Sequence, residues 1–202
     1  MSRVGIAQER RRSPVAYDDA DMRADASRNL SRVLRTGALL LAEDPTTSIA
    51  TIAAQSGVDR RTVYRRFDTR EALLTAVFQA KLDSAQRVLD EARLVEAPVP
   101  VALHRYVEGI IPVSREWPLD TRRMMQTDPV ANARRKEQSQ RLDRFVQRAG
   151  DEGFLRADLP AGWARSMLDS LVDSAAHNFA GIEAPQAADL VVDTLLNGIG
   201  LR

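Results

Sequence analysis

The sequence predicts an all-α fold of about nine helices. Apolar residues recur at intervals of three and four along most of the chain, and no segment alternates apolar and polar residues as a half-buried strand would. Prolines and glycines punctuate these periodic segments at intervals typical of helix lengths. The chain has 202 residues, of which 44% are hydrophobic and 28% charged, so it can form one or two compact domains with a buried core.

Four helices are expected in the N-terminal part. Residues 1–24 show no sustained apolar period and are interpreted as a mobile arm. The first helical spacing begins at Leu30 and stops at Asp44-Pro45, because the residue before a proline avoids the helical conformation. Gly57 should end a short second helix. The second, third and fourth helices each have a plausible N-cap, respectively Ser48, Asp59 and Thr69.

The C-terminal part is expected to continue as helices. A fifth helix is predicted over about residues 101–111, with Pro112 breaking the pattern. The pair Asp128-Pro129 should open a polar helix that extends to about Gly150. Two strongly apolar helices are then predicted, over residues 163–179 and 185–199.

Composition excludes several classes of protein. The absence of cysteine rules out disulfides and thiol catalysis and suits a reducing cytoplasm, and two histidines make a His-rich metal site unexpected. No apolar run approaches the roughly 20 residues that cross a bilayer. The sequence contains no Gly-rich phosphate loop, nucleophile elbow or HExxH motif. We therefore expect a cytoplasmic protein that is not an enzyme and has no metal or cofactor.

Positive charge is concentrated near the N-terminus, although the net charge is only +1. Up to Arg70 the chain has 13 arginines against 9 acidic residues. The densest cluster is Arg60, Arg61, Arg65, Arg66 and Arg70. Such a cluster indicates a polyanionic partner such as nucleic acid, with a solvated helix face as the alternative.

The cluster falls on the second of two short helices joined by a glycine turn, which is the pattern of a helix-turn-helix. The apolar residues that would hold these helices together are Ile52, Val58, Val63 and Phe67. The opposite face of the second helix is then free to enter a DNA major groove, where its arginines can neutralise phosphates or read base edges.

Residues 47–74 resemble the helix-turn-helix of the TetR family of bacterial transcriptional regulators. They combine Ile-Ala, Gly-Val, Thr-hydrophobic-Tyr, Phe and Glu-x-Leu-Leu in one register, and residues 32–43 resemble the family's first helix. The resemblance implies a homodimer that binds a palindromic DNA operator, usually as a repressor, and whose C-terminal domain binds a small molecule. We expect residues 25–70 to bind DNA and residues 71–202 to dimerise and bind the ligand.

The resemblance also implies roles for individual residues. Thr62 and Tyr64 occupy positions that touch base edges or the DNA backbone, and Arg66 and Arg70 occupy positions that meet phosphate. The variable positions that would set the DNA sequence are Arg60, Arg61 and Arg65. Thr47 and Ser48, at the start of the second helix, suit phosphate through hydroxyl and free N–H groups. The run Arg10–Arg12 is either a minor-groove arm or a tail.

Two departures from the family pattern stand out. Arg61 replaces a residue that is often small. Gly37 lies inside the first helix, where alanine is common and where glycine costs about 1 kcal/mol.

The two apolar C-terminal helices should form a four-helix bundle with their mates in a dimer. The expected interface residues are Met167, Leu168, Leu171, Val172, Ala175, Phe179, Val191 and Leu195. Burial inside a single chain is the alternative, and the two arrangements can share residues.

An effector pocket is expected between the fourth helix and this bundle, for an apolar or amphipathic small molecule. Its candidate lining residues are Tyr106, Ile110, Trp117, Met124, Met125 and Phe145, with ordinary core packing as the alternative. His104 or His177 could supply a polar contact. A DNA-binding dimer without any effector is the second functional hypothesis.

Overall fold

The computed structural model describes residues 19–119 and 128–199. Within these ranges the chain forms eight helices and no strand, against the nine or so expected. The helices are α1 (Asp19–Glu43), α2 (Ile49–Ser56), α3 (Arg60–Arg66), α4 (Arg70–Glu91), α5 (Val99–Glu116), α7 (Pro129–Asp151), α8 (Trp163–His177) and α9 (Ala184–Ile199).

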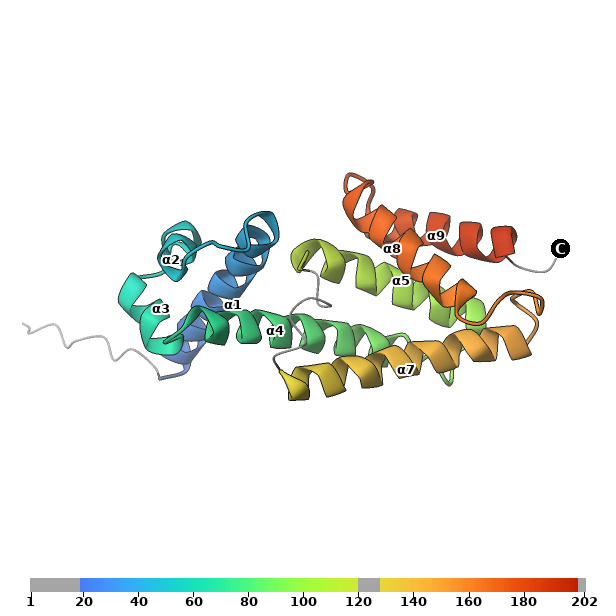
Figure 1. Ribbon diagram of the computed structural model, residues 1–202, viewed down its shortest axis with the longest axis horizontal. Helices are drawn as coiled ribbons and strands as arrows, with labels where there is room; N and C mark the ends of the chain where they lie inside the picture. The colour runs from blue at the N-terminus through green and yellow to red at the C-terminus, as the bar shows by residue number, and fades with distance from the viewer. Residues whose placement is uncertain (1–18, 120–127, 200–202) are drawn as a thin grey trace, which may run out of the picture.

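The helices are arranged as two bodies joined by α4 (Figure 1). Helices α1, α2 and α3 gather around the first turns of α4, which then extends into the second body. There α7 runs beside α4, and α5 packs against α4 on one side and against α8 and α9 on the other. Helix α5 is therefore the centre of the second body, and the side chains of Val107 and Ile111 are fully buried there.

Local capping explains why the short helices begin and end where they do. The Ser48 hydroxyl accepts from the Thr51 N–H at 3.1 Å, and the Thr69 hydroxyl accepts from the Ala72 N–H at 3.1 Å. Asp59 accepts from the first N–H groups of α3, and Asp128 from those of α7. Gly57 ends α2 in a left-handed conformation with φ of 66°. These predicted helix boundaries are confirmed.

Two predicted boundaries are wrong. Helix α1 begins at Asp19, so residues 19–24 belong to a helix rather than to an arm; the run Arg10–Arg12 lies outside the described residues. This first stretch is rich in alanine, and Asp25 pairs with Arg28 one turn later, which stabilises a helix without an apolar stripe.

Pro112 does not break α5, which continues to Glu116. The proline lacks an N–H to donate, but its neighbours Ile111 and Val113 are buried in the core. Packing on both sides of the proline therefore holds the helix together across the missing hydrogen bond.

The two glycines within α1 and α5 should respond oppositely to alanine. A Cβ on Gly37 would lie 3.6 Å from Val77 Cγ2, an ordinary contact, so Gly37→Ala should raise the free energy of unfolding by about 1 kcal/mol through helix propensity. A Cβ on Gly109 would lie 2.9 Å from Val88 Cγ1. Gly109→Ala should be destabilising, since overpacking costs about 1–3 kcal/mol.

Urea unfolding followed by circular dichroism measures both effects. Val88→Ala added to the Gly109→Ala chain should recover part of the lost stability, because it removes the clashing methyl groups. A Gly109→Ala protein as stable as the Gly37→Ala protein would contradict the close approach of α4 and α5.

None of the described helices is long and apolar enough to cross a membrane.

Candidate DNA-binding surface and ligand cavity

The short helix α3 turns its apolar residues inward and its arginines outward. Val63 and Phe67 are buried, whereas Arg60, Arg61, Arg65 and Arg66 are exposed. Phe67 follows the last turn of α3 and donates its backbone N–H to the Val63 carbonyl at 2.9 Å. The same few residues thus anchor the helix and leave its charged face open to a partner.

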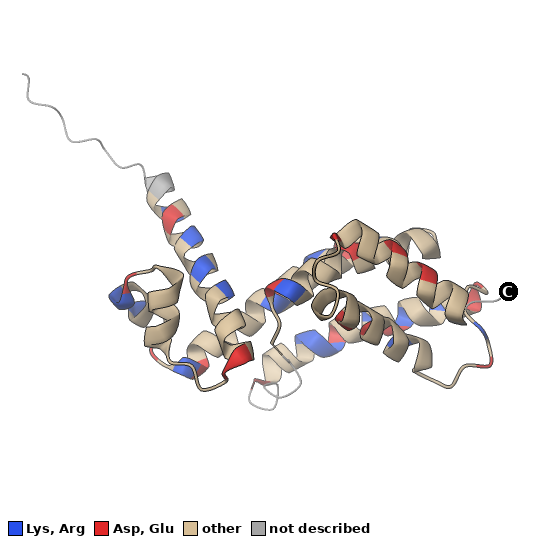
Figure 2. Cartoon of the chain, turned by 90° about the horizontal axis from the view of Figure 1, so that it is seen from above, with Lys and Arg blue, Asp and Glu red and all other residues tan. Residues whose placement is uncertain are grey.

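These four arginines have no acidic partner within the described ranges. In the second body, by contrast, several arginines of α7 and α8 are paired with carboxylates, as in Arg134–Asp83 at 2.6 Å and Arg141–Asp90 at 2.7 Å. Figure 2 shows the uncompensated arginines at the tip of α3, at the end of the molecule far from α9. Unpaired guanidinium groups on an exposed helix are suited to phosphate and to base edges.

Tyr64 and Arg60 lie together on the exposed face of α3. The Arg60 guanidinium carbon is 5.1 Å from the centroid of the Tyr64 ring, a cation–π contact. Tyr64 remains 37% exposed, and Thr62, two residues before it, is half-buried. The contact therefore keeps Tyr64 beside Arg60 on the exposed face of α3.

Thr47, Ser48 and Arg70 have structural partners near the start of α2. The Thr47 hydroxyl donates to the Leu40 carbonyl at 3.4 Å, and the Ser48 hydroxyl caps α2. Arg70 donates from Nε to the Thr47 carbonyl at 3.3 Å, so it ties the start of α4 to the turn before α2. These contacts fix the turn and place the three residues beside each other; phosphate contact by them stays a prediction.

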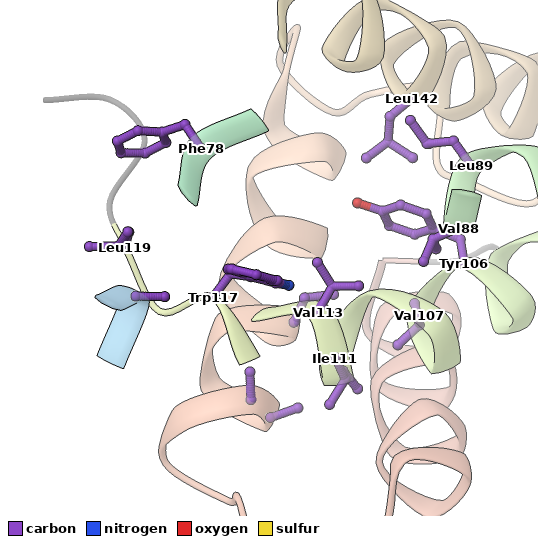
Figure 3. Close-up of a cluster of buried hydrophobic side chains, with 14 of the residues drawn as sticks. Phe78, Val88, Leu89, Tyr106, Val107, Ile111, Val113, Trp117, Leu119 and Leu142 are labelled. Atoms are coloured by element: carbon purple, nitrogen blue, oxygen red, sulfur yellow. The ribbon is translucent and has the colours of Figure 1, made fainter. Parts of the chain in front are cut away.

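A cavity of about 420 Å³ lies between α4, α5, α7 and α8. Tyr106 and Ile110 line it, as expected from the sequence. Trp117 and Phe145 do not line it, because both are packed in the core, and Met124 and Met125 lie outside the described residues. Figure 3 shows the separation: Tyr106 lies beside Leu89 and Leu142, whereas Trp117 lies toward Leu119 and Phe78.

The cavity has an apolar part and a polar part. Ala85, Leu89, Ile110 and Leu142 form the apolar part. On the polar side, Arg165 donates to Asp143 at 2.7 Å and to Asp169 at 3.0 Å. Burial alone would lower the pKa of Arg165, but the nearby Asp169 and Asp143 carboxylates raise it, so the guanidinium stays charged. Such a lining suits an amphipathic molecule.

Two polar groups of the cavity lack partners within the described part of the chain. The Tyr106 side chain is 7% exposed and its hydroxyl has no hydrogen-bond partner there; burial raises the pKa of Tyr106 well above its usual value, so the hydroxyl stays protonated. The Nε atom of Arg135 is buried and also unpartnered. A buried donor without a partner costs free energy, which a bound ligand can recover.

Sequence reasoning missed the polar residues that α7 contributes to this cavity. Its lining includes Arg135, Gln138 and Ser139, which the sequence pattern places on a polar helix with no sign of burial. Gln138 is buried and donates to the Leu82 carbonyl at 2.9 Å. Only the position of α7 against α4 shows that these polar residues face inward.

Most of the expected dimer-interface residues are buried within the single chain. These residues are Leu168, Val172, Ala175, Val191 and Leu195. Met167 and Leu171 are half-buried, and Phe179 is 57% exposed. These five residues therefore pack α8 and α9 onto the core of the single chain, which is the alternative arrangement; contact with a partner stays a prediction.

The outer side of α8 and α9 nevertheless carries an apolar groove of about 210 Å³. Leu171, Phe179, Ile182 and Leu190 contribute to it, and Leu190 is 53% exposed. Leu190 was missed because Val191 and Val192 next to it are also apolar, and only the structure shows which of the three faces outward.

The histidines contact acidic residues rather than the cavity. His104 Nε2 lies 2.9 Å from Asp189 Oδ1, which joins α5 to α9, and His177 lies 3.6 Å from Asp173. Neither residue lines the cavity between α4, α5, α7 and α8.

The geometry defines a class of protein: a helix-turn-helix with a cationic exposed face, joined by one long helix to a helical body with a cavity among its helices. This is the arrangement of a ligand-responsive DNA-binding regulator. Residues 39–77 match the family model described as bacterial regulatory proteins, tetR family. The matched residues span α2, α3 and the adjoining parts of α1 and α4, so the chain carries a helix-turn-helix similar to that of the TetR-family regulators.

Similar proteins extend the likeness to most of the chain. The HTH-type transcriptional repressor LfrR of Mycolicibacterium smegmatis is 29% identical over 173 residues, which cover 83% of this chain and 88% of the relative. The crystal structure of LfrR in complex with proflavine matches with a TM-score of 0.65 and 26% identity, covering 87% of this chain and 99% of LfrR.

The fold is shared more widely. The ketosteroid transcriptional regulator KstR2 of Mycobacterium tuberculosis matches with a TM-score of 0.70 at 18% identity, over 86% of this chain and 95% of KstR2.

Proposed function

We propose that the protein is a dimeric repressor that binds a palindromic operator through α3 and releases it when a small molecule occupies the cavity. The observation that carries DNA binding is the exposed face of α3, whose four arginines have no acidic partner among the described residues. In this proposal residues 25–70 form the DNA-binding domain, and residues 71–202 form the domain for dimerisation and ligand binding. The arginines neutralise phosphates, while Thr62 and Tyr64 contact bases or backbone.

We assign dimerisation to the outer face of α8 and α9, where a second copy of the chain would pack. An exposed phenylalanine and leucine beside a groove, here Phe179 and Leu190, favour association. In this proposal a twofold axis at this face lets the two copies of α3 face the same duplex. Two recognition helices then meet successive major grooves about 34–36 Å apart.

The effector is assigned to the cavity that Tyr106 lines. The apolar part of the cavity can hold a planar or aliphatic ligand. The Tyr106 hydroxyl, which has no hydrogen-bond partner among the described residues, can bond to a polar group of that ligand. LfrR, which binds proflavine, has the same fold, and in this chain the carboxylates of Asp143 and Asp169 stand at the cavity. Proflavine, a planar aromatic cation, is therefore a suitable first probe.

DNA binding is tested by selecting duplexes from a random library with the purified protein and measuring their affinity by fluorescence anisotropy. The selected site should be an inverted repeat, and log affinity should fall linearly with log salt because phosphate contacts release counterions. Tyr64→Ala should bind the selected site more weakly. Failure to select any sequence, or binding independent of salt, would count against the proposal.

Replacing Tyr106 by phenylalanine should separate ligand binding from folding. Tyr106→Phe removes a hydroxyl that has no hydrogen-bond partner in the described part of the chain, so the free protein should be about as stable as the wild type. Proflavine at 100 times its dissociation constant should stabilise the wild type by about 2.7 kcal/mol, and the variant less at the same concentration. Thermal unfolding with and without proflavine measures both.

A wide screen of small molecules, with proflavine included, tests the effector itself. If none shifts the melting temperature or releases selected DNA, the protein is a DNA-binding dimer without an effector, the second functional hypothesis. A Tyr106→Phe protein much less stable than the wild type would show that the hydroxyl has a structural role instead.

A further inference from the structure

The last turn of α5 and the residues just after it contact α8 with the turn that follows it, α1 and α4. Arg115 donates to four backbone carbonyls at the end of α8 and in the turn after it: Ala176 at 3.3 Å, Ala175 at 3.1 Å, Phe179 at 3.4 Å and Ile182 at 2.9 Å. The carbonyls at a helix C-terminus carry partial negative charge, so a guanidinium is well suited to bind them. Two of these residues, Phe179 and Ile182, also line the outer apolar groove.

The next residue, Glu116, reaches the other body. Its carboxylate forms an ion pair with Arg35 of α1, which belongs to the helix-turn-helix end of the chain. Three residues further on, the Leu119 carbonyl accepts from Lys81 Nζ of α4 at 2.7 Å. Consecutive residues of one helical turn therefore hold the α8–α9 turn and the first helix of the DNA-binding end.

We propose that Arg115 and Glu116 are positioning residues that couple the α8–α9 face to the orientation of the DNA-binding helices. The inference rests on the proposed function, because it concerns the same DNA and the same dimer face. Arg115 fixes the α8–α9 turn against α5, and Glu116 fixes α1 against the same turn of α5. The angle between the α8–α9 face and α3 is then set by the short segment that contains Arg115 and Glu116.

The cavity lies on the same helix. Tyr106 and Ile110 face it from α5, and Arg115 follows Tyr106 by nine residues, about 13 Å along the helix axis. A ligand that displaces α5 would also shift Arg115 and Glu116, because the helix continues through Pro112 with Ile111 and Val113 buried on either side of it. This gives the cavity a physical connection to both ends of the molecule.

Charge-reversal variants distinguish the effect of the Arg35–Glu116 ion pair on DNA affinity from the effect of the protein's net charge. The variants are Arg35→Glu, Glu116→Arg and the double variant, each measured on duplexes selected with the wild type. If only net charge mattered, Arg35→Glu would weaken DNA binding and Glu116→Arg would strengthen it. If the ion pair positions the DNA-binding helices, both single variants should weaken DNA binding by about three- to twentyfold, because a dimer loses one exposed ion pair in each of its two copies. The double variant, which restores an ion pair of reversed polarity, should recover the affinity.

The spacing between the half-sites gives a second readout, which a loss of folding stability would not change. The wild type should bind most tightly at one half-site spacing in a series of duplexes whose spacing is lengthened or shortened by single base pairs. Arg35→Glu and Glu116→Arg, each alone, should reduce the difference in affinity between these duplexes. Arg28→Glu is the matched control, because it makes the same charge change in α1 at a residue whose partner, Asp25, lies in the same helix. The control should keep the wild-type spacing preference.

Arg115→Lys tests the other half of the coupling, since lysine keeps the charge but cannot reach four carbonyls at once. It should flatten the spacing preference while the protein stays folded by circular dichroism. Wild-type spacing profiles in all these variants, or a double reversal no better than the singles, would overturn the coupling. A wild type that selects no DNA at all would instead refute the proposed function.

Discussion

Replacing Arg65 and Arg66 together by glutamine should lower the affinity for selected duplex DNA by roughly 100-fold or more. Both side chains are exposed on α3 and have no acidic partner in the described part of the chain, so neither contributes an ion pair to folding. A well-made contact between arginine and DNA contributes about 1–3 kcal/mol, and a dimer loses each contact in both half-sites. Fluorescence anisotropy with a labelled selected duplex measures the change.

The salt dependence of binding assigns the role of the two arginines. Each phosphate contact that is lost should reduce the slope of log affinity against log salt by about 0.9. Arg144→Gln is a suitable control, because Arg144 is exposed on α7 in the other body. Equal loss of affinity in the control and in the Arg65/Arg66 variant would mean that overall charge, and not the face of α3, determines binding.

Phe67→Ala should destabilise the DNA-binding end by about 3–5 kcal/mol, the range for removing a buried phenylalanine side chain. Phe67 is 5% exposed and joins the same hydrophobic core as Val33 of α1 and Val63 of α3. Without the ring, α3 loses the packing that holds it at its angle to α1. The variant should therefore bind DNA poorly, although Phe67 itself is buried away from any duplex.

Urea unfolding measures this effect, with Phe67→Leu as the conservative control. Leucine keeps most of the apolar volume and should cost much less than alanine. A Phe67→Ala protein with wild-type stability and wild-type DNA affinity would show that α3 is positioned by something other than this packing.

The helix-turn-helix was predictable from sequence because its determinants are local. Ser48, Asp59 and Thr69 cap helices through hydrogen bonds to N–H groups two or three residues away, and Gly57 supplies the one left-handed turn between them. Val63 and the exposed arginines separate onto opposite faces of α3 by the helical period alone. No distant contact was needed to place these residues.

The cavity and the dimer face were less predictable because they depend on how helices meet. Arg135 and Gln138 look like solvent-facing residues of a polar helix until α7 is packed against α4. Leu168 and Val191 look like a dimer stripe, but the chain buries them against its own core. The Arg115 contacts join residues about 60 positions apart, and neither periodicity nor capping indicates them.

The central claim is that two copies of α3 face one duplex at the pitch of B-form DNA. Hydroxyl-radical footprinting of the wild-type protein on a selected duplex tests it most directly. We expect two protected patches centred about 10–10.5 base pairs apart, or a whole multiple of that separation, and both should be lost with the Arg65/Arg66 double variant. A single patch, or protection that persists in the variant, would contradict the claim.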